Sequence, residues 1–196
     1  MKRILVSLGL LLCMNVAFAT PAPVELLQKT SNGLISSLEK HQSKLESQPV
    51  FVNGIVREKL VPIVDIDEMA SQVLGRYRRQ AKGEKWAQFK KAFVKLVIQN
   101  YAAPLADYNG DKVEFLPVRG FKPTTSRATI TSIIIRPNGQ RIPLSYKFVR
   151  EGDTWRVIDF SVDGISMVES YRSQFASLLA QKGFDGLLAR LQRSPA

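Results

Sequence analysis

A single block of strand-like sequence stands between two stretches of helix-like sequence, and this order limits the fold more than any other feature. Residues 112–160 are rich in β-branched and aromatic side chains, and Asn138-Gly139 is typical of a tight hairpin turn. On both sides of this block, apolar residues recur at the three- and four-residue spacing of helices. Strands joined by short turns pair in antiparallel fashion, because parallel neighbours need a long crossover connection.

The helix-like stretches divide into segments of ordinary length. Their periodicity predicts helices at 23–42, 50–60 and 66–74, and a longer helix that ends near Pro104. In the longer helix, the aromatic residues from Trp86 to Tyr101 share one face, while most of the lysines lie off it. The strands are predicted at 113–118, 127–136, 140–149 and 154–160.

Two capping boxes mark helix starts. Asp65 precedes Glu68 by three residues, and the same spacing separates Ser166 from Glu169. In this motif the first side chain accepts a hydrogen bond from a backbone N–H that the helix itself leaves without a partner. The second box therefore predicts a helix that starts at Ser166, and Gly183 predicts its end before a last short helix.

These elements predict an α+β fold: a curved antiparallel sheet of about four strands, with a long helix in its concave face and further helices. Such packing buries the apolar face of the sheet against the apolar stripe of the helix. We expect one domain over 20–196, mostly helical at 20–104, a sheet at 112–160 and helical again at 166–192. This length suffices for one domain with a sizeable core.

The first residues have the organisation of a secretory signal peptide, predicted at 1–19. Lys2 and Arg3 precede an apolar run at 4–16, and Ala17-Phe18-Ala19 has the small-x-small form of a cleavage site. The run is shorter than the about 20 apolar residues of a membrane-spanning helix, so an uncleaved anchor is the weaker alternative. We expect cleavage after Ala19 and export to a bacterial periplasm, and no later run is long enough to span a membrane.

Removal of the signal peptide (the leader) also removes Cys13, the single cysteine. The mature chain is therefore expected to lack disulfides and thiol chemistry. The chain has 28 Lys and Arg against 17 Asp and Glu, and of the basic residues only Lys2 and Arg3 lie in the leader. A basic surface favours anionic partners, such as acidic proteins or anionic lipid head groups. Export and the dispersed arrangement of the basic residues argue against nucleic acid as a partner.

Motifs for catalysis or metal binding are scarce. His41 is the single histidine and is expected on the surface, and no G-x-S-x-G, phosphate-binding loop or dinucleotide fingerprint occurs. We therefore expect no metal, no cofactor and no enzyme activity. Asp159 is the strongest candidate for a general base, although a structural hydrogen bond or ion pair is the favoured role. An isomerase or dehydratase that uses Asp159 or Tyr101 stays open as an alternative, as does an adaptor with a closed core.

Short motifs spread over nearly the whole mature chain stand in a particular order. They are Val64–Ala70, Val73–Gly75, the aromatic helix from Trp86 to Tyr101, Trp155–Asp159, Gly164–Ser166, Tyr171–Phe175 and Gly183–Asp185. Each motif alone is weakly specific. In this order and spacing, they resemble the toluene-tolerance, or MlaC, family, the periplasmic phospholipid-binding proteins of the maintenance-of-lipid-asymmetry pathway.

The resemblance implies a nuclear-transport-factor-2-like sheet and helices that enclose a deep apolar pocket. It also implies a soluble periplasmic carrier that holds a diacyl phospholipid by its acyl chains and performs no catalysis. Its expected partners are an inner-membrane ABC transporter complex and an outer-membrane lipoprotein–porin complex, between which lipid moves to maintain outer-membrane lipid asymmetry.

Holding acyl chains requires apolar lining from both sheet and helices. Each buried methylene contributes about 0.8 kcal/mol, and a bilayer offers a 16-carbon chain the same gross stabilisation of roughly 12 kcal/mol. The candidate lipid contacts are Phe93, Val97, Tyr101, Ile133, Ile135, Tyr146, Phe148, Trp155, Val157, Val162, Ile165 and Val168. For each of them, core packing is an alternative of at least equal weight, and a one-residue slip of a strand turns its side chains to the other face.

Overall fold

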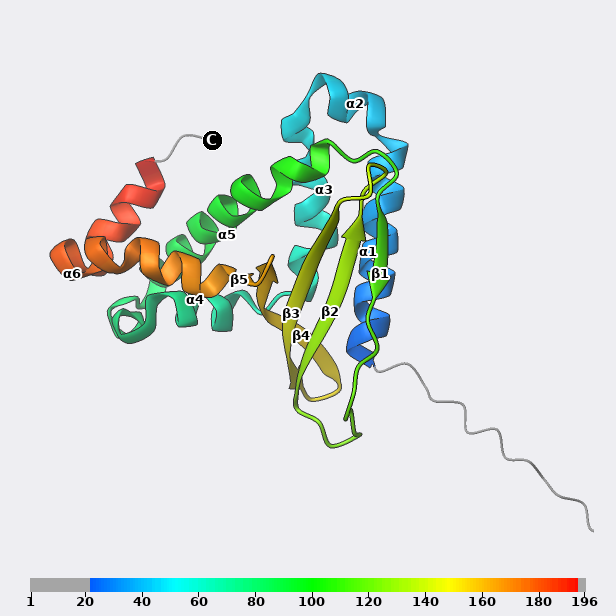
Figure 1. The fold of residues 1–196 in the computed structure, drawn as a ribbon. Helices are drawn as coiled ribbons and strands as arrows, with labels where there is room; N and C mark the ends of the chain where they lie inside the picture. Colours follow the sequence, from blue (N-terminus) through cyan, green and yellow to red (C-terminus); the bar gives the residue numbers. More distant parts are fainter. Residues whose placement is uncertain (1–21, 194–196) are drawn as a thin grey trace, which may run out of the picture.

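The computed structural model describes residues 22–193, which form helices, then a sheet, then a final helix (Figure 1). The α-helices are α1 (Ala22–Lys40), α2 (Gln42–Ser47), α3 (Val52–Lys59), α4 (Ile66–Leu74), α5 (Gly83–Ala106) and α6 (Met167–Arg193). The strands are β1 (Lys112–Phe115), β2 (Arg127–Ile135), β3 (Arg141–Glu151), β4 (Thr154–Val162) and β5 (Ile165–Ser166). The 3-10 helices η1 (Pro49–Phe51), η2 (Val61–Ile63) and η3 (Gly75–Gln80) lie between α-helices. The expected signal peptide and Cys13 lie outside the described residues.

The strands form one antiparallel sheet in the order β1-β2-β3-β4-β5, so the α+β class and the antiparallel pairing are confirmed. The four predicted strands are present, and β5 adds a two-residue fifth strand. It follows the turn at Asp163-Gly164, where φ is 50° and 80°. An Asp-Gly pair suits such a turn, because both central residues of this hairpin type need positive φ.

The register of the sheet divides its side chains between two faces. Ile130 pairs with Tyr146 and Ser132 pairs with Leu144, so these residues share one face. We call it the inner face, because Ile130 packs there in one core cluster with Val24 of α1. The odd-numbered residues of β2 and β3 lie on the opposite, outer face.

A β-bulge changes this alternation in β4. Tyr146 pairs with Phe160, whereas Phe148 pairs with Val157 and leaves Ile158 as the extra residue. Phe160 and Val157 therefore both lie on the inner face, although one has an even number and the other an odd number. A simple two-residue repeat along β4 does not foresee this arrangement.

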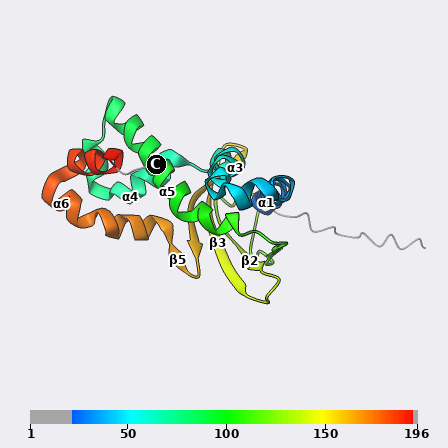
Figure 2. The ribbon, with the colours of Figure 1, turned by 90° about the horizontal axis from the view of Figure 1, so that it is seen from above.

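Helix α1 lies alongside the sheet, where it contacts β1, β2 and β4 (Figure 1). The long helix α5, expected in the concave face, packs mainly against α3, α4 and α6. It reaches the sheet through Tyr101, whose ring centroid lies 4.9 Å from that of Phe160. Seen from above, the sheet and α1 occupy one side of the molecule, and α4 and α6 the other (Figure 2). An amphipathic stripe shows that a helix buries one face, but not which element covers that face.

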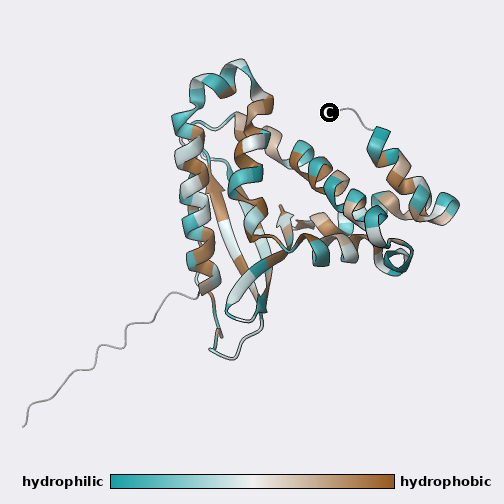
Figure 3. Cartoon of the chain, turned by 180° about the vertical axis from the view of Figure 1, so that it is seen from behind, coloured by the Kyte–Doolittle hydropathy of each residue, from teal (hydrophilic) through white to brown (hydrophobic). Residues whose placement is uncertain are grey.

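Buried apolar side chains form two clusters. The larger joins the sheet to α4, α6 and the first half of α5, where it includes Phe89 and Phe93. The smaller joins α2 and α3 to Leu38 of α1 and to Ile98 and Ala102 of α5. Helices α1 and α5 thus contribute to both clusters, and apolar and polar residues alternate along them (Figure 3).

Both capping boxes are confirmed at their first residue. Asp65 Oδ1 accepts a hydrogen bond of 2.9 Å from the N–H of Glu68, and Ser166 Oγ accepts one of 3.2 Å from the N–H of Glu169. Helix α5 extends beyond its predicted end, because Pro104 lies within its last turn. A proline there removes one backbone donor, and the helix ends two residues later at Ala106.

Helix α6 breaks at Gly183 as predicted, with φ 62° and ψ −168°, and then resumes. The N–H of Phe184 donates a hydrogen bond of 3.1 Å to Gln80 Oε1 of η3. This side chain satisfies a backbone donor where the second part of α6 begins. This hydrogen bond therefore links η3 to α6 at the point where α6 breaks.

Candidate functional site

Half-buried apolar side chains adjoin the two core clusters. They come from α1, α3 and α5 and from the inner face of the sheet, and we call them the apolar border: Leu34, Leu60, Val97, Tyr101, Leu105, Tyr146 and Phe160. Single exposed apolar residues are common on any protein. The residues of the apolar border, in contrast, come from helices and sheet together and keep part of their apolar surface in solvent.

Eight of the predicted lipid contacts belong to the larger cluster or pack against it. Phe93, Phe148, Trp155, Val157 and Val168 are inside it, each 7% exposed or less. Val97, Tyr101 and Tyr146 are half buried against it. Core packing accounts for the five buried side chains, whereas the three half-buried ones retain apolar surface for a ligand.

Two predicted contacts on β2 lie on the other side of the sheet. Ile133 pairs with Pro143 and Ile135 pairs with Arg141, which places both isoleucines on the outer face. They are half buried, and in the described part of the chain they belong to neither core cluster. They therefore do not share a face with Tyr146, and their contact with lipid stays a prediction.

Val162 and Ile165 lie on either side of the turn between β4 and β5, where they pair with one another. Val162 is half buried, but Ile165 is 66% exposed. Ile165 thus presents an apolar side chain to solvent beside the start of α6. It is positioned to contact a lipid or a partner only outside the core.

The inner face also holds a buried hydroxyl that sequence reasoning did not single out. Ser132 is fully buried, and within residues 22–193 its Oγ makes no hydrogen bond of good geometry. Burial raises the pKa of the nearby Tyr146 phenol, and the Ser132 hydroxyl offsets that rise only in part. An unsatisfied buried hydroxyl costs about 1–3 kcal/mol, so Ser132 is a candidate contact for a polar atom of a ligand.

The Asp159 carboxylate is 2% exposed, and both of its oxygens are engaged. Oδ2 accepts hydrogen bonds from Ser166 Oγ (2.7 Å) and Lys147 Nζ (3.0 Å), and Oδ1 accepts one from the Val168 N–H (3.1 Å). Burial, and then the Asp159 charge, raise the pKa of Tyr101. This geometry fits the structural role of Asp159 and leaves neither group arranged as a general base.

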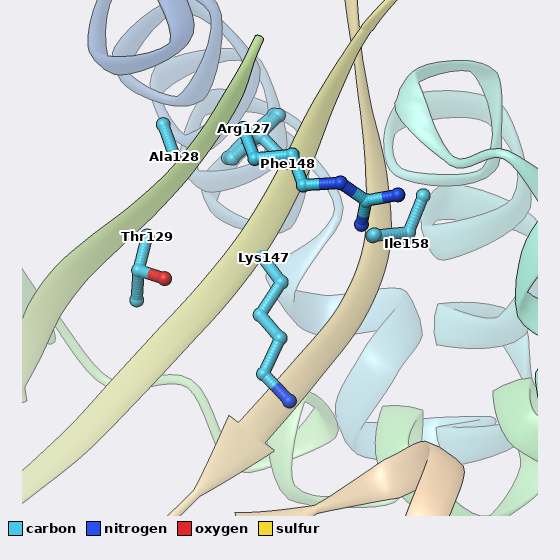
Figure 4. A pocket seen from close by; sticks show the side chains of 6 residues that line it. All are labelled: Arg127, Ala128, Thr129, Lys147, Phe148 and Ile158. Carbon is cyan, nitrogen blue, oxygen red and sulfur yellow. The ribbon is translucent and has the colours of Figure 1, made fainter. Parts of the chain in front are cut away.

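A shallow hollow of about 210 Å³ lies over β2, β3 and β4, on the side of the outer-face residues Arg127, Thr129 and Lys147 (Figure 4). Its lining residues are Arg127, Ala128, Thr129, Lys147, Phe148 and Ile158. Figure 4 shows the Arg127 side chain crossing β3 toward Ile158. Pockets for drug-sized ligands usually measure about 300–1,000 Å³ and are mostly apolar, whereas two cations line this hollow. It is not the deep apolar pocket that the resemblance implies, and that pocket stays a prediction.

Metal binding and membrane spanning find no support between Ala22 and Arg193. No three His, Cys, Asp or Glu side chains of this part gather to hold a metal ion. Among the described helices, none combines the length and apolar character needed to cross a membrane. His41 is half buried rather than exposed, because its Nδ1 lies 2.8 Å from the Ser37 carbonyl oxygen and its ring packs on Phe51.

Two curated proteins are similar to this chain over most of their length. The Haemophilus influenzae protein named intermembrane phospholipid transport system binding protein MlaC is 30% identical over 183 residues, which span 92% of this chain and 85% of the relative. Toluene tolerance protein ttg2D of Pseudomonas putida is 27% identical over 185 residues, or 94% of this chain and 84% of the relative.

A solved structure shares the fold. It is the phospholipid-binding protein from Ralstonia solanacearum, determined in complex with a phospholipid, and it matches with a TM-score of 0.79. The match covers 86% of this chain and 93% of that one at 24% identity, which supports likeness of fold alone. The family model described as MlaC protein matches residues 28–193. This match spans most of the chain, and the protein therefore belongs to the MlaC protein family.

Proposed function

We propose that this protein is a periplasmic carrier that holds the acyl chains of a diacyl phospholipid between its sheet and its helices. The observation that supports the proposal most is the apolar border, where both layers keep apolar surface open beside two separate cores. A relative is named for phospholipid transport, and the Ralstonia solanacearum neighbour was solved with a phospholipid. The chain's membership of the MlaC protein family makes the same ligand class reasonable here.

Acyl chains enter this protein where the two clusters meet. The side chains of the apolar border are already partly exposed, so a lipid chain that covers them removes apolar surface from water at about 25 cal/mol per Å². Separating fully buried partners such as Phe89 and Phe93 instead breaks close packing and costs more. An acyl chain therefore enters at the lowest free-energy cost at the junction of the two clusters, along α1 and α5.

The cellular setting is part of the same proposal. The leader is removed after Ala19, and residues 20–196 act as a single lipid-binding domain in the periplasm. The carrier exchanges lipid with an inner-membrane ABC transporter complex and an outer-membrane lipoprotein–porin complex, and so maintains outer-membrane lipid asymmetry. The order of basic residues, apolar run and small-x-small site in the leader supports export.

An isomerase or dehydratase is the less favoured alternative. The names of the relatives describe lipid binding and transport, and the oxygens of Asp159 already accept hydrogen bonds from three donors. Such an enzyme needs an accessible base in an apolar site. The arrangement around Asp159 offers structure rather than a base that is free to accept a proton.

Uptake of lipid from vesicles tests the proposal. Protein stripped of lipid is mixed with phosphatidylethanolamine–phosphatidylglycerol vesicles, separated from them by size, and extracted with organic solvent. A carrier retains about one phospholipid per chain after separation. Protein that emerges without phospholipid from both expression and vesicles contradicts the proposal.

A further inference from the structure

The basic residues are less dispersed than the sequence analysis expected, because a strongly basic segment joins α4 to α5. From Gly75 to Lys95 the chain has eight Lys and Arg, with Glu84 as the one acidic residue. The segment comprises η3 and the first half of α5, and it lies at the end of the molecule away from the sheet (Figures 1 and 2). A large share of the net charge of +11 is therefore concentrated at one end.

Three of these cations are engaged within the protein. Lys85 Nζ pairs with Asp185 at 2.8 Å, and Lys90 Nζ pairs with Asp67 at 2.8 Å. The Arg78 guanidinium donates to the hydroxyl of Ser71 and to the carbonyl oxygen of Ala81. These contacts hold η3 and α5 against α4 and α6. The backbone that carries the remaining cations is therefore fixed in position.

Of the other five cations, Lys95 is half buried, and the remaining four are exposed and without acidic partners within residues 22–193. Arg76, Arg79, Lys82 and Lys91, which we call the basic end, make no ion pair in the part of the chain that the structure describes. Arg76 contacts the phenol of Tyr77, to which its Nη2 donates at 3.1 Å. Four such charges on one short stretch repel one another, and an anionic surface relieves that repulsion.

The N-terminus of α5 adds to the positive potential of the basic end. The helix starts at Gly83, and its N-cap residue is Lys82, for which no side-chain capping bond is formed. Ser, Thr, Asp or Asn usually occupies this position and accepts from the first backbone N–H groups. The Lys82 side chain cannot accept from those groups, and the dipole of a 24-residue helix favours negative charge beside them.

Two aromatic side chains with polar tips stand among the cations. Trp86 is half buried, with the Arg78 guanidinium 3.8 Å from its ring centroid, and its Nε1 donates to Asp67 at 2.9 Å. Tyr77 is also half buried, with Arg76 over its ring. Trp and Tyr next to Lys and Arg are the combination that proteins use at the level of lipid head groups.

We propose that the basic end, together with the N-terminus of α5, docks this protein on an anionic phospholipid surface. An acidic protein surface is less favoured, because Arg76, Arg79 and Lys82 are long, exposed side chains without the fixed geometry that paired recognition of carboxylates requires. A bilayer offers laterally mobile phosphates that adapt to them. The inference rests on the proposed function for its purpose, since a lipid carrier gains from residing at a lipid surface.

Vesicle co-sedimentation of the purified protein tests the docking surface. The vesicles contain phosphatidylcholine either alone or mixed with phosphatidylglycerol. The test variant Arg76→Glu/Arg79→Glu/Lys82→Glu is compared with Lys112→Glu/Arg119→Glu/Lys122→Glu, which reverses three exposed charges on the sheet side. Circular dichroism and thermal unfolding establish that each variant folds, and Arg76→Gln/Arg79→Gln/Lys82→Gln serves as the milder replacement if the first does not.

The expected results separate the two triple variants. The unchanged protein binds vesicles that contain phosphatidylglycerol, binds phosphatidylcholine alone weakly, and loses binding at high salt. The basic-end variant is expected to bind the anionic vesicles about 100-fold more weakly. This figure follows from the binding free energy that each basic side chain usually contributes near an anionic surface. The sheet-side control keeps most of the binding.

Three outcomes overturn the inference. They are equal loss in the two triple variants, equal binding to neutral and anionic vesicles, and absence of vesicle binding by the unchanged protein, the last of which points to an acidic protein partner. Extraction of the basic-end variant separates this inference from the proposed function. Failure of docking alone leaves about one phospholipid in each chain, whereas failure of the proposed function leaves no phospholipid in any variant.

Discussion

The buried Asp159 carboxylate accepts a hydrogen bond of 2.7 Å from Ser166 Oγ, which in turn accepts one of 3.2 Å from the N–H of Glu169. The two residues lie on opposite sides of the turn at Asp163-Gly164, one in β4 and the other just before α6. Their contact therefore links β4 directly to the start of α6. Because α6 contributes to the larger cluster, the same contact positions part of the core.

Removal of this contact is expected to destabilise the protein. Asp159→Ala leaves Ser166 Oγ and the Val168 N–H without their acceptor and is expected to lower the free energy of unfolding by about 2–4 kcal/mol. Ser166→Ala removes the cap and one of the three donors to Asp159, and is expected to cost about 1–2 kcal/mol. Urea denaturation measures both. Asp163→Asn in the exposed turn is the control, and equal effects of the two Asp substitutions contradict the structural role of Asp159.

The raised pKa of the Tyr146 phenol predicts a loss of stability at alkaline pH. Burial raises the pKa of Tyr146 above that of the unfolded chain, so its contribution to stability is complete below the ordinary pKa of about 10. The contribution is lost as pH rises from there through the folded-state pKa. Tyr146→Phe is therefore expected to flatten the decline above about pH 10, measured by urea denaturation. An unchanged slope contradicts this origin.

Two glycines are expected to respond to alanine in opposite directions. Gly183 has φ 62°, and a Cβ there lies 3.4 Å from Gln80 Oε1, so Gly183→Ala is expected to cost about 1–2 kcal/mol. Gly33 lies inside α1 with open space around it, and Gly33→Ala is expected to stabilise by up to about 1 kcal/mol. Thermal unfolding of both variants tests the helix break. If Gly183→Ala instead stabilises the protein, the helix does not break at Gly183.

The apolar border predicts where a new charge blocks lipid uptake. Val97→Glu places a carboxylate among the half-buried side chains that adjoin the larger cluster and is expected to reduce phospholipid uptake from vesicles at least about tenfold. Ile133→Glu is the matched control, because this residue is also half buried but lies on the outer face. Equal uptake by the two folded variants contradicts the inner-face location of the acyl chains.

Features that depend on residues close in sequence were predictable. The caps at Asp65 and Ser166 need only a side chain and a backbone N–H three residues later, and both bonds are present. The hairpin turn at Asn138-Gly139 and the break at Gly183 likewise follow from single residues that tolerate positive φ. Apart from α2, the α-helices lie close to where the sequence predicts them, as do four of the five strands.

Features that depend on distant contacts were not predictable in the same way. The bulge opposite Lys147 and Phe148 shifts the register of β4, so the face of each later side chain depends on its partner strand. The placement of Ile133 on the outer face likewise depends on strand pairing. Three consecutive isoleucines end β2, so its sequence lacks the alternation of polar and apolar residues that would identify the inner face. Ser132 gave no signal in the sequence, because only the fold shows that its hydroxyl is buried without a partner.

The central claim is that this chain carries phospholipid, and native mass spectrometry of the purified protein tests it most directly. The account predicts a species heavier than the protein by the mass of one diacyl phospholipid, which organic extraction removes and identifies. A spectrum that shows only the bare chain, both as purified and after incubation with phospholipid vesicles, contradicts the account.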